Sequence, residues 1–220
     1  MTSRRIGGFL AVLGGVLAAV GNLLHPRYTG TDIDNYRKVA DSDMYTVANL
    51  IIIVALILTA AGFVAIASTF TGTLAQYGGM AAGVGAAIAL AQTGIETFGV
   101  KQAALAMSTA SDADRSGAFW ATNAADRINV SLFNTWTIVF LGLAPLLIGA
   151  AMVAARRVGS MIGWLGVLGG AGCVLVGFIG LSRTDQDPLN GPFFVTSLIT
   201  TLFILVAGVQ LMRESADAPA

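Results

Sequence analysis

Long apolar runs separated by polar segments dominate the chain. Six of these runs are long enough to cross a bilayer core of about 30 Å, which takes roughly 20 helical residues. They cover residues 6–24, 46–69, 77–101, 129–155, 159–181 and 193–212. The period-2 alternation of a barrel strand is absent, and a lone segment satisfies its backbone groups in lipid only as a helix. The pattern predicts an all-α fold, a polytopic transmembrane bundle of six helices that forms one domain over residues 1–212, followed by a disordered tail at 213–220.

The composition agrees with a membrane protein. Hydrophobic residues make up 55% and charged residues 11% of the 220 positions, whereas soluble domains carry about 25% charged residues. The formal net charge of +0 gives no reason to expect a nucleic-acid partner. One His and one Cys are too few for a multi-His or multi-Cys metal site, and we expect no metal and no cofactor.

The connecting segments predict the topology. Residues 24–46 and 101–129 are expected to form long polar loops, and residues 70–76 and the Arg156-Arg157 turn short ones. With both termini on one side, that side carries Arg4, Arg5, Arg156, Arg157 and Arg213. The six basic residues of the other side are accompanied by nine acidic ones, so we expect both termini in the cytoplasm of a bacterial cell and the bundle in its plasma membrane.

The first apolar run follows Ser3-Arg4-Arg5, a start that is also typical of a secretory or twin-arginine signal. The length of this run and the five further runs favour a retained first helix.

Internal similarity suggests how the helices are organised. Residues 8–15 and 163–170 are identical at six of eight positions, and Gly8, Ala11 and Gly14 match Gly79, Ala82 and Gly85. Three parallel helical hairpins would explain these matches, and shared Gly/Ala/Leu composition is the alternative. The spacings Gly159-x-x-x-Gly163 and Gly166-x-x-x-Gly170 predict close helix packing, within the chain or between copies in a homo-oligomer.

The fourth and fifth runs carry a family resemblance. The motifs are Gly142-Leu143-Ala144-Pro145-Leu146-Leu147-Ile148-Gly149, Arg156-Arg157 and Ile162-Gly163-Trp164-Leu165-Gly166-Val167-Leu168-Gly169-Gly170. Over about a third of the chain, this pattern resembles small bacterial six-helix integral membrane proteins described only as a domain of unknown function, and the Gly/Ala-rich composition resembles actinobacterial proteins. Because the shared motif is a packing motif, the resemblance implies the fold and no chemistry.

Polar side chains are unevenly distributed along the predicted helices. The halves next to the short connections are nearly free of them, whereas the halves next to the long loops hold amides and hydroxyls from five helices. Under the predicted topology they lie at similar depth in the outer leaflet, which predicts a polar cavity open to the outside. The candidate substrate-binding residues are Asn22, Asn49, Gln92, Thr93, Asn134 and Trp136.

Glu96 is the only acid within the apolar runs, and Gln92 and Thr93 lie on the same helical face. Desolvation in hydrocarbon favours a protonated carboxyl, the form that a general acid or a proton carrier needs. We therefore expect Glu96 to be the catalytic residue. The alternatives are a carboxylate solvated at the interface, or one that joins helices by bonding to Asn134 or Lys101.

Four other residues suggest supporting roles. His25, which the match between the first and third helices aligns with Glu96, is a candidate for proton exchange, although Pro26 alone explains a histidine at a helix end. The indole of Trp136 is placed to stabilise positive charge. Pro145 predicts a kink with a freed carbonyl, and the pair Phe119-Trp120 a lid over the cavity.

Three functions suit these residues. The first is a membrane-embedded enzyme that cyclises or isomerises a lipid or isoprenoid-like substrate by acid catalysis, without a cofactor. The second is a small transporter or ligand-binding membrane subunit that uses Glu96 for proton or cation exchange. The third is an accessory membrane protein without chemistry. The expected partners are the lipid bilayer and a hydrophobic small molecule or lipid.

Overall fold

The computed structural model describes residues 3–26, 31–155, 160–183 and 187–214. Within these ranges the regular elements are all helical, and six helices are long and apolar enough to cross a membrane. The all-α fold and the six spans are therefore confirmed. The expectations for Arg156, Arg157, Gly159 and the tail at 215–220 concern residues outside the described ranges, whereas Arg213 and Glu214 belong to the last helix and not to a tail.

The predicted runs are extended at several ends, because helices continue past the apolar stretch that marks the membrane. The elements are α1 (Ser3–Leu24), α2 (Asp32–Asp41), α3 (Asp43–Ala67), α4 (Thr73–Gly94), η1 (Ile95–Val100), α5 (Lys101–Thr109), α6 (Arg115–Trp136), η2 (Thr137–Leu143), α7 (Ala144–Ala154), α8 (Ser160–Leu181) and α9 (Asp187–Glu214). Here η denotes a π-helical segment. Elements α4, η1 and α5 form one continuous helix, Thr73–Thr109, and α6, η2 and α7 form another, Arg115–Ala154.

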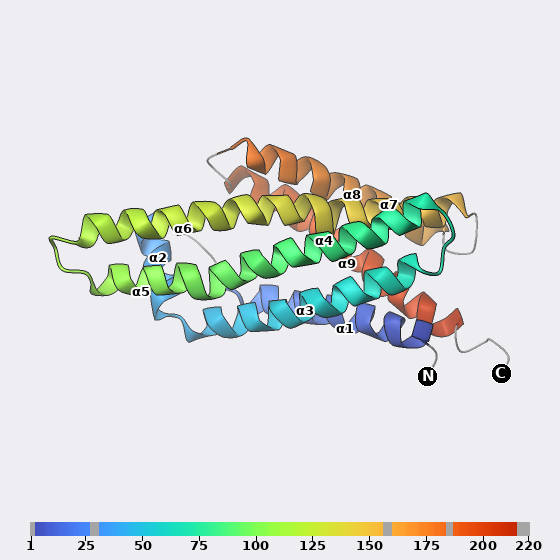
Figure 1. Ribbon diagram of the computed structural model, residues 1–220, viewed down its shortest axis with the longest axis horizontal. Helices are drawn as coiled ribbons and strands as arrows, with labels where there is room; N and C mark the ends of the chain where they lie inside the picture. The colour runs from blue at the N-terminus through green and yellow to red at the C-terminus, as the bar shows by residue number, and fades with distance from the viewer. Residues whose placement is uncertain (1–2, 27–30, 156–159, 184–186, 215–220) are drawn as a thin grey trace.

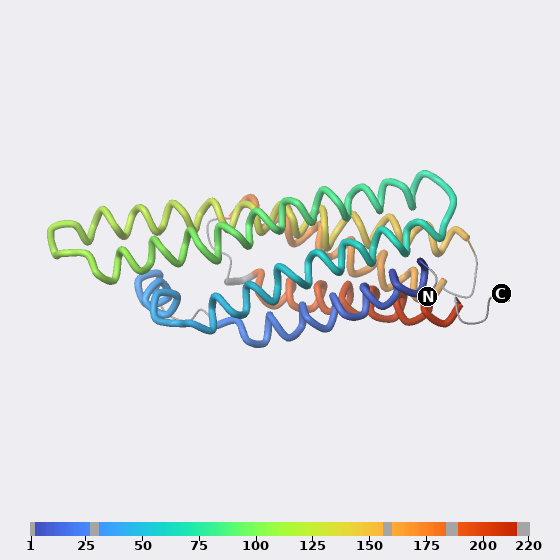
Figure 2. Tube along the Cα trace, turned by 60° about the horizontal axis from the view of Figure 1, so that its bottom comes forward, coloured from blue at the N-terminus to red at the C-terminus, as the bar shows by residue number. Residues whose placement is uncertain are grey.

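Three antiparallel hairpins build the bundle (Figure 1). They are α1 with α3, the helix Thr73–Thr109 with the helix Arg115–Ala154, and α8 with α9. Each hairpin packs on the next, and α1 packs on α9, so that the helices form a closed ring. All three hairpins start at the end where both chain termini lie, which we call the terminal end (Figures 1 and 2). The prediction of three parallel hairpins is thereby confirmed.

The middle hairpin is much longer than the other two. Its helices have 37 and 40 residues, or about 55 and 60 Å at 1.5 Å per residue, and they project beyond the other hairpins at the end opposite the termini (Figure 2). We call α5, residues 115–127 of α6 and α2 the stalk. The prediction of long polar loops over residues 24–46 and 101–129 is thus wrong within the described residues. The polar residues there end the apolar run, but the helix continues through them.

The stalk has a small core of its own. Tyr36, Val39 and Ala40 of α2 pack with Tyr45 of α3 and with two residues of α5, Ala104 and Met107. Helix α2 begins with a capping box in which Thr31 and Asp34 exchange hydrogen bonds. The polar segments can therefore fold outside the membrane, because one face of each is apolar.

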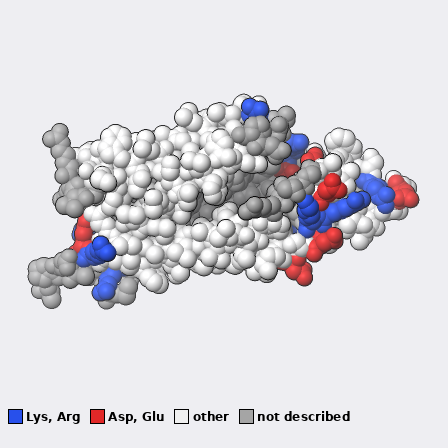
Figure 3. Space-filling view, turned by 180° about the vertical axis from the view of Figure 1, so that it is seen from behind, with Lys and Arg blue, Asp and Glu red and all other residues white. Residues whose placement is uncertain are grey.

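Charged side chains agree with this placement. On the face seen in Figure 3 they gather toward the two ends of the molecule, and a wide belt of uncharged residues separates them. The belt carries exposed leucines and phenylalanines of α8 and α9, which suit contact with lipid.

The centre of the bundle is aromatic. Phe63, Phe140 and Phe203, one from the second helix of each hairpin, are fully buried. The ring centroid of Phe63 lies 5.6 Å from that of Phe140 and 6.4 Å from that of Phe203. We call these three side chains the Phe layer. Helices approach closely around it: a Cβ on Gly85 would lie 2.7 Å from the Phe140 backbone. The small residues predicted to mediate packing do so within the chain.

The carbonyl that Pro145 leaves free forms the polar contact that its sequence position predicts. Proline lacks the N–H that would bond to the carbonyl four residues earlier, and the hydroxyl of Thr200 donates to this Leu141 carbonyl oxygen at 3.3 Å. The π-helical segment η2 ends at Leu143, two residues before Pro145. Cys173 is buried beside Thr200, with 3.8 Å between its sulfur and the Thr200 hydroxyl oxygen.

Candidate functional site

A cluster of polar side chains lies where the bundle meets the stalk, around Glu96 in the π-helical segment η1. Oε1 of Glu96 lies 3.2 Å from Nε2 of His25, at the end of α1. Oε2 accepts a hydrogen bond from Nε2 of Gln92 at 2.8 Å. The Tyr45 hydroxyl donates to the backbone carbonyl of Glu96 at 3.1 Å. Three helices therefore hold Glu96 in place, and π-helical segments are frequent at functional sites.

The contacts of His25 fix the number of protons in this pair. Its Nδ1 lies 3.2 Å from the Pro26 carbonyl oxygen, which can only accept, so Nδ1 carries a proton. The contact between Nε2 and Glu96 then needs one more proton, either on the imidazole or on the carboxyl. The pair is thus an imidazolium with a carboxylate, or a neutral imidazole with a carboxylic acid.

Burial and charge act in opposite directions on His25. Burial alone would lower the pKa of its imidazole, but the hydrogen bond to Glu96 and the negative charge there outweigh it. The net result is a pKa above the usual value for histidine. Residue 25 lies just beyond the first membrane span, Ser3–Leu24, where protons can be exchanged with water.

Gln92 is the centre of the cluster. Its Nε2 donates to Glu96 and also to Oδ1 of Asn129 at 2.6 Å. Its Oε1 accepts from the indole of Trp136 at 3.1 Å and from the hydroxyl of Thr93 at 3.4 Å. These four bonds use both amide hydrogens and both lone pairs. Gln92 therefore holds the Glu96 carboxyl against α6.

The hydrogen bonds continue from this cluster into the stalk. Asn129 also bonds to Asp126, whose Oδ2 accepts from the hydroxyl of Tyr36 at 3.3 Å. Asn123 donates to the same hydroxyl at 3.2 Å. Burial first, and the charge of Asp126 second, raise the pKa of Tyr36 well above its usual value. A connected polar path thus leads from His25 at the membrane boundary to α2.

Lys101 does not pair with Glu96. Its Nζ donates to the backbone carbonyl of Ser42 at 2.6 Å, at the corner between α2 and α3. The Ser42 hydroxyl caps α3 by accepting from the amide of Tyr45 at 3.2 Å. The alternative that Glu96 joins helices is supported, but through His25 and Gln92 instead of Lys101 or Asn134.

The other predicted residues divide into two groups. Gln92, Thr93, Glu96, Trp136 and His25 come together. Asn22 and Asn134 do not: Asn22 is exposed and donates to the Ala18 carbonyl of its own helix, and Asn134 donates to the Val130 carbonyl and lies against Gly180 of α8. In an α-helix each residue is turned by about 100° from the last, so Asn22 points away when Gly21 packs on α3.

Asn49 lies inside the bundle, one turn after Tyr45, and its side-chain amide forms no hydrogen bond with any described residue. Five residues of the site are not among the candidates of the sequence analysis: Tyr36, Tyr45, Asn123, Asp126 and Asn129. A signal existed for Asn129, which lies seven residues before Trp136 and so shares its helical face. Asn129 is the first residue of the apolar run 129–155, where a polar residue is ordinary, so the run alone does not single it out.

Around Glu96 the described residues form neither the expected open polar cavity nor the expected lid. Gln92, Thr93, Asn49 and Asn134 are buried among other side chains. Phe119 and Trp120 are part of helix α6, with Phe119 packed on Tyr36 and Trp120 65% exposed. A polar residue in a bundle can be satisfied by a neighbouring helix as well as by a cavity, and the sequence does not distinguish the two.

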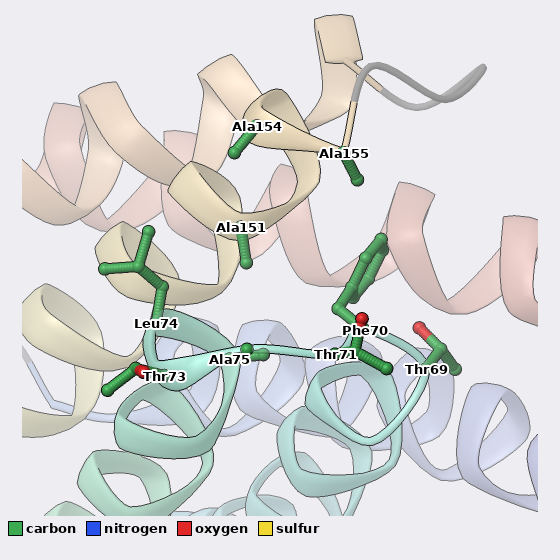
Figure 4. A pocket seen from close by; sticks show the side chains of 10 residues that line it. Thr69, Phe70, Thr71, Thr73, Leu74, Ala75, Ala151, Ala154 and Ala155 are labelled. Atoms are coloured by element: carbon green, nitrogen blue, oxygen red, sulfur yellow. The ribbon is translucent and has the colours of Figure 1, made fainter.

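Two pockets lie elsewhere. One, of about 560 Å³, is at the terminal end, where Ala151, Ala154 and Ala155 face the turn before α4 (Figure 4). The other, of about 330 Å³, is an apolar groove between α1 and α3 that is lined by residues such as Leu17 and Val54. Among the described residues no group of three His, Cys, Asp or Glu side chains is arranged to hold a metal ion.

The fold and the cluster define the class of molecule: a multi-pass membrane protein of three hairpins with a buried polar network at one boundary. No family model matches the sequence, and no curated protein or solved structure matches it either. The argument for function therefore depends on the chemistry of the cluster.

Proposed function

We propose that this membrane protein transfers a proton from the Glu96–His25 pair to a lipid or isoprenoid-like substrate, as the acid in an isomerisation or cyclisation. The observation that carries the proposal is the 3.2 Å contact between Nε2 of His25 and Oε1 of Glu96, which needs a shared proton, made by side chains that remain 17% and 16% exposed at the membrane boundary. A fully buried pair would be a purely structural contact. A partly exposed one can give its proton to a bound molecule.

The surroundings of the pair support a substrate from the bilayer. Leu23 and Leu24 directly precede His25 in the chain and are 82% and 39% exposed. Such side chains face lipid in a bundle of this kind. A hydrophobic molecule in the membrane would therefore meet an apolar surface with one acidic group at its edge.

The reaction balances without a cofactor. The proton of Glu96 goes to one carbon of a substrate double bond, whose electron pair forms the new C–H bond and leaves a cation on the neighbouring carbon. Loss of a proton from an adjacent carbon to the carboxylate gives an isomer, and attack by a second double bond, followed by loss of a proton, gives a ring. In this scheme the proton that the substrate loses to the carboxylate restores the Glu96–His25 pair, His25 holds that proton in contact with Glu96 between turnovers, and Gln92 orients the carboxyl.

Deuterium transfer tests the proposal without knowledge of the substrate. The purified protein in lipid nanodiscs is incubated in D₂O with a bacterial lipid extract, and the lipids are analysed by mass spectrometry. We expect an isomeric or cyclised product with one new C–D bond, formed about 100-fold or more slowly by Glu96→Gln, the usual loss for a general acid. Glu214→Gln, which removes a carboxyl at the terminal end, is the matched control and should leave the rate unchanged. Equal deuterium incorporation by Glu96→Gln and wild type would contradict the proposal.

A second candidate is a small transporter or ligand-binding subunit that exchanges a proton at this pair. The partly exposed contact between His25 and Glu96 at the membrane boundary favours it, because a histidine there can take up and release a proton near neutral pH. It predicts proton uptake by proteoliposomes that Glu96→Gln abolishes, with no deuterated lipid product. If Glu96→Gln behaves like wild type in both assays, the remaining candidate is an accessory membrane protein without chemistry.

We also propose that the terminal end lies in the cytoplasm of a bacterial cell. Arg4, Arg5 and Arg213 at this end support it, since basic residues close to helix ends are enriched on the cytoplasmic side. The basic residues of the stalk are accompanied by acidic ones, as in the ion pair of Arg115 with Asp112 at 3.0 Å. The stalk then lies outside the cell.

A further inference from the structure

Tyr45 contacts both members of the Glu96–His25 pair and is itself fully buried. Its hydroxyl donates to the backbone carbonyl of Glu96 at 3.1 Å. The centroid of its ring lies 5.2 Å from that of the His25 imidazole, with 56° between the two ring planes. These contacts join three elements, because His25 follows α1, Tyr45 belongs to α3 and Glu96 belongs to η1. The proposed reaction gives Tyr45 no part, so its contacts need a physical explanation of their own.

The two contacts act on different parts of the pair. The hydroxyl holds the main chain at residue 96, and it leaves the two carboxyl oxygens of Glu96 to His25 and Gln92. A carbonyl oxygen has two lone pairs, so it can accept this hydroxyl in addition to a helical N–H. The ring of Tyr45 lies against the imidazole at a distance typical of packed aromatic pairs, which restricts rotation of the imidazole. Tyr45 therefore fixes the relative position of the two side chains that share a proton.

A second bond joins the same two segments in the opposite direction. Lys101, the first residue after η1, donates from Nζ to the backbone carbonyl of Ser42 at 2.6 Å. Ser42 is the corner at which α2 ends and α3 begins. Helix α3 thus gives a side-chain donor to η1, and the helix that continues from η1 gives one back to the corner. The corner and the segment that carries Glu96 are therefore held together at two points.

Tyr45 also belongs to the core of the stalk. Its side chain packs in one cluster with Val39 of α2 and Met107 of α5. Helix α2 is joined to α3 by Ser42 alone, and Tyr45 lies in the first turn of α3. A displacement of α2 therefore reaches Tyr45 both through the chain and through the packed side chains of this core.

We infer that Tyr45 is the positioning residue through which the stalk sets the contact between His25 and Glu96, so that the placement of α2 regulates the pair. Because Tyr45 is fully buried, it acts through these two residues and not on a substrate. The consequence for proton transfer rests on the proposed function, whereas the contact itself is present in the free protein and can be measured there.

A second route from the stalk to the pair has to be distinguished from this one. It runs from Tyr36 through Asp126 and Asn129 to Gln92, entirely through polar side chains. Val39 is 1% exposed and has no polar group in that route. Val39→Ala therefore loosens the stalk core beside Tyr45 and leaves the polar route chemically intact.

The chain has one histidine, so NMR of the imidazole reports on His25 without ambiguity. Full-length protein labelled with ¹³C,¹⁵N-histidine, purified on a tag without histidine, is titrated in nanodiscs in the absence of substrate. We expect the pKa of His25 in Tyr45→Phe to lie between the pKa values in wild type and in Glu96→Gln. The reason is that the carboxylate that raises this pKa is held less firmly without the hydroxyl.

The controls keep the other charges constant. Phenylalanine retains the ring, so the stalk core stays packed in Tyr45→Phe. Lys101 of α5, and Asp126 of α6, whose charge interacts with that of Glu96, are unchanged in this variant. Tyr77→Phe, which removes a 57% exposed hydroxyl from the first turns of α4, is the matched control and should titrate like wild type. A Tyr45→Phe protein that also titrates like wild type would overturn the inference.

Val39→Ala tests the step from the stalk to Tyr45. We expect it to lower the pKa of His25 as well, and to have a smaller effect when it is added to Tyr45→Phe, because substitutions that act through one contact are not additive. An effect of equal size in both backgrounds shows that the stalk acts through Asn129 and Gln92 instead, and no effect in either shows that it does not act on the pair. Both results contradict the inference.

Deuterium transfer separates this inference from the proposed function. If wild type forms the deuterated product, we expect Tyr45→Phe to form it about 10- to 100-fold more slowly, the effect of a misplaced acid. If wild type forms none, the proposed function fails, and the titration of His25 still decides whether Tyr45 positions the pair.

Discussion

His25 and Glu96 depend on each other because one proton serves both. Seventy-one positions separate them in the chain, and the contact of 3.2 Å between Nε2 and Oε1 is made by helices of two different hairpins. Loss of either side chain leaves the other with an unsatisfied group at the membrane boundary, which costs more than the net value of the bond itself. The pair should therefore stabilise the protein in a manner that depends on pH.

The raised pKa of His25 gives the sign of this dependence. A group whose pKa is higher in the folded than in the unfolded state stabilises the fold fully below its ordinary pKa of about 6.5, and the stabilisation is lost as the pH rises through the higher, folded value. We expect His25→Gln to destabilise the protein by about 1.5–3 kcal/mol below pH 6.5, and by progressively less above it.

Thermal unfolding of wild type and His25→Gln in nanodiscs from pH 5 to 9 measures the effect. Glu96→Gln is the partner control, since without the carboxylate the pH dependence of wild type should largely disappear. A difference between wild type and His25→Gln that is constant across this range would rule out a proton shared by the pair.

Of the two contacts of the Glu96 carboxyl, the one with Gln92 could be predicted from the sequence and the one with His25 could not. Gln92 and Glu96 are four residues apart in one helix, so local geometry alone places them together. His25 aligned with Glu96 when the first and third helices were compared, and the two do lie at the same depth. Equal depth in two helices does not determine contact, however, because contact also requires both side chains to face the same neighbour, and only the packed structure shows which faces meet.

Among the elements, the glycine faces set how closely the hairpins approach. A Cβ on Gly170 would lie 2.5 Å from the Gly142 carbonyl oxygen and 2.6 Å from the Leu146 nitrogen, both in the neighbouring helix. A Cβ on Gly83, in α4, would meet nothing within 4 Å. The two glycines therefore have the same secondary structure and opposite surroundings.

We expect Gly170→Ala to destabilise the bundle by about 1–3 kcal/mol, because backbone atoms must move apart. Gly83→Ala should stabilise it by about 0.5–1 kcal/mol, since alanine is the better helix former and space is free. Unfolding midpoints of both variants in the same detergent check the prediction. A loss of stability for Gly83→Ala as large as that for Gly170→Ala would mean that helix packing is not the cause.

The membrane spans were predictable from their apolar length, but the full helices were not. A polar sequence such as residues 101–127 is compatible with a loop or with a helix outside lipid. Its choice depends on tertiary contacts such as those among Tyr36, Ala104 and Met107. Pro145 was the exception, because its missing N–H has the same consequence in any surroundings.

For the whole molecule, the ring of three hairpins places the turn between α3 and α4 and the turn between α5 and α6 at opposite ends (Figure 1). Thr71 belongs to the first turn, and Ser108 is the last residue but one of α5, at the tip of the stalk. Both residues are exposed, and the native Cys173 is buried. A membrane-impermeant thiol reagent should therefore distinguish the two ends in intact cells.

Under the proposed orientation, Ser108→Cys is labelled from outside and Thr71→Cys only after the membrane is opened. Wild type, whose only cysteine is Cys173, is the control for background labelling. Labelling of Thr71→Cys in intact cells would invert the orientation of the whole bundle and place the stalk in the cytoplasm.

The contact between α1 and α9 has a consequence for the order of the chain. Because the ring is closed by the first and last described helices, and Ser3 and Glu214 lie at the same end, a short linker between these residues would not cross the bundle. New ends could be opened at the exposed turn between α3 and α4, where Gly72 has a φ of 121° and a Cβ added to it would meet no atom within 4 Å. Such a circular permutant retains every contact between hairpins. The order in which the three hairpins follow one another in the chain can therefore be rotated without changing the fold.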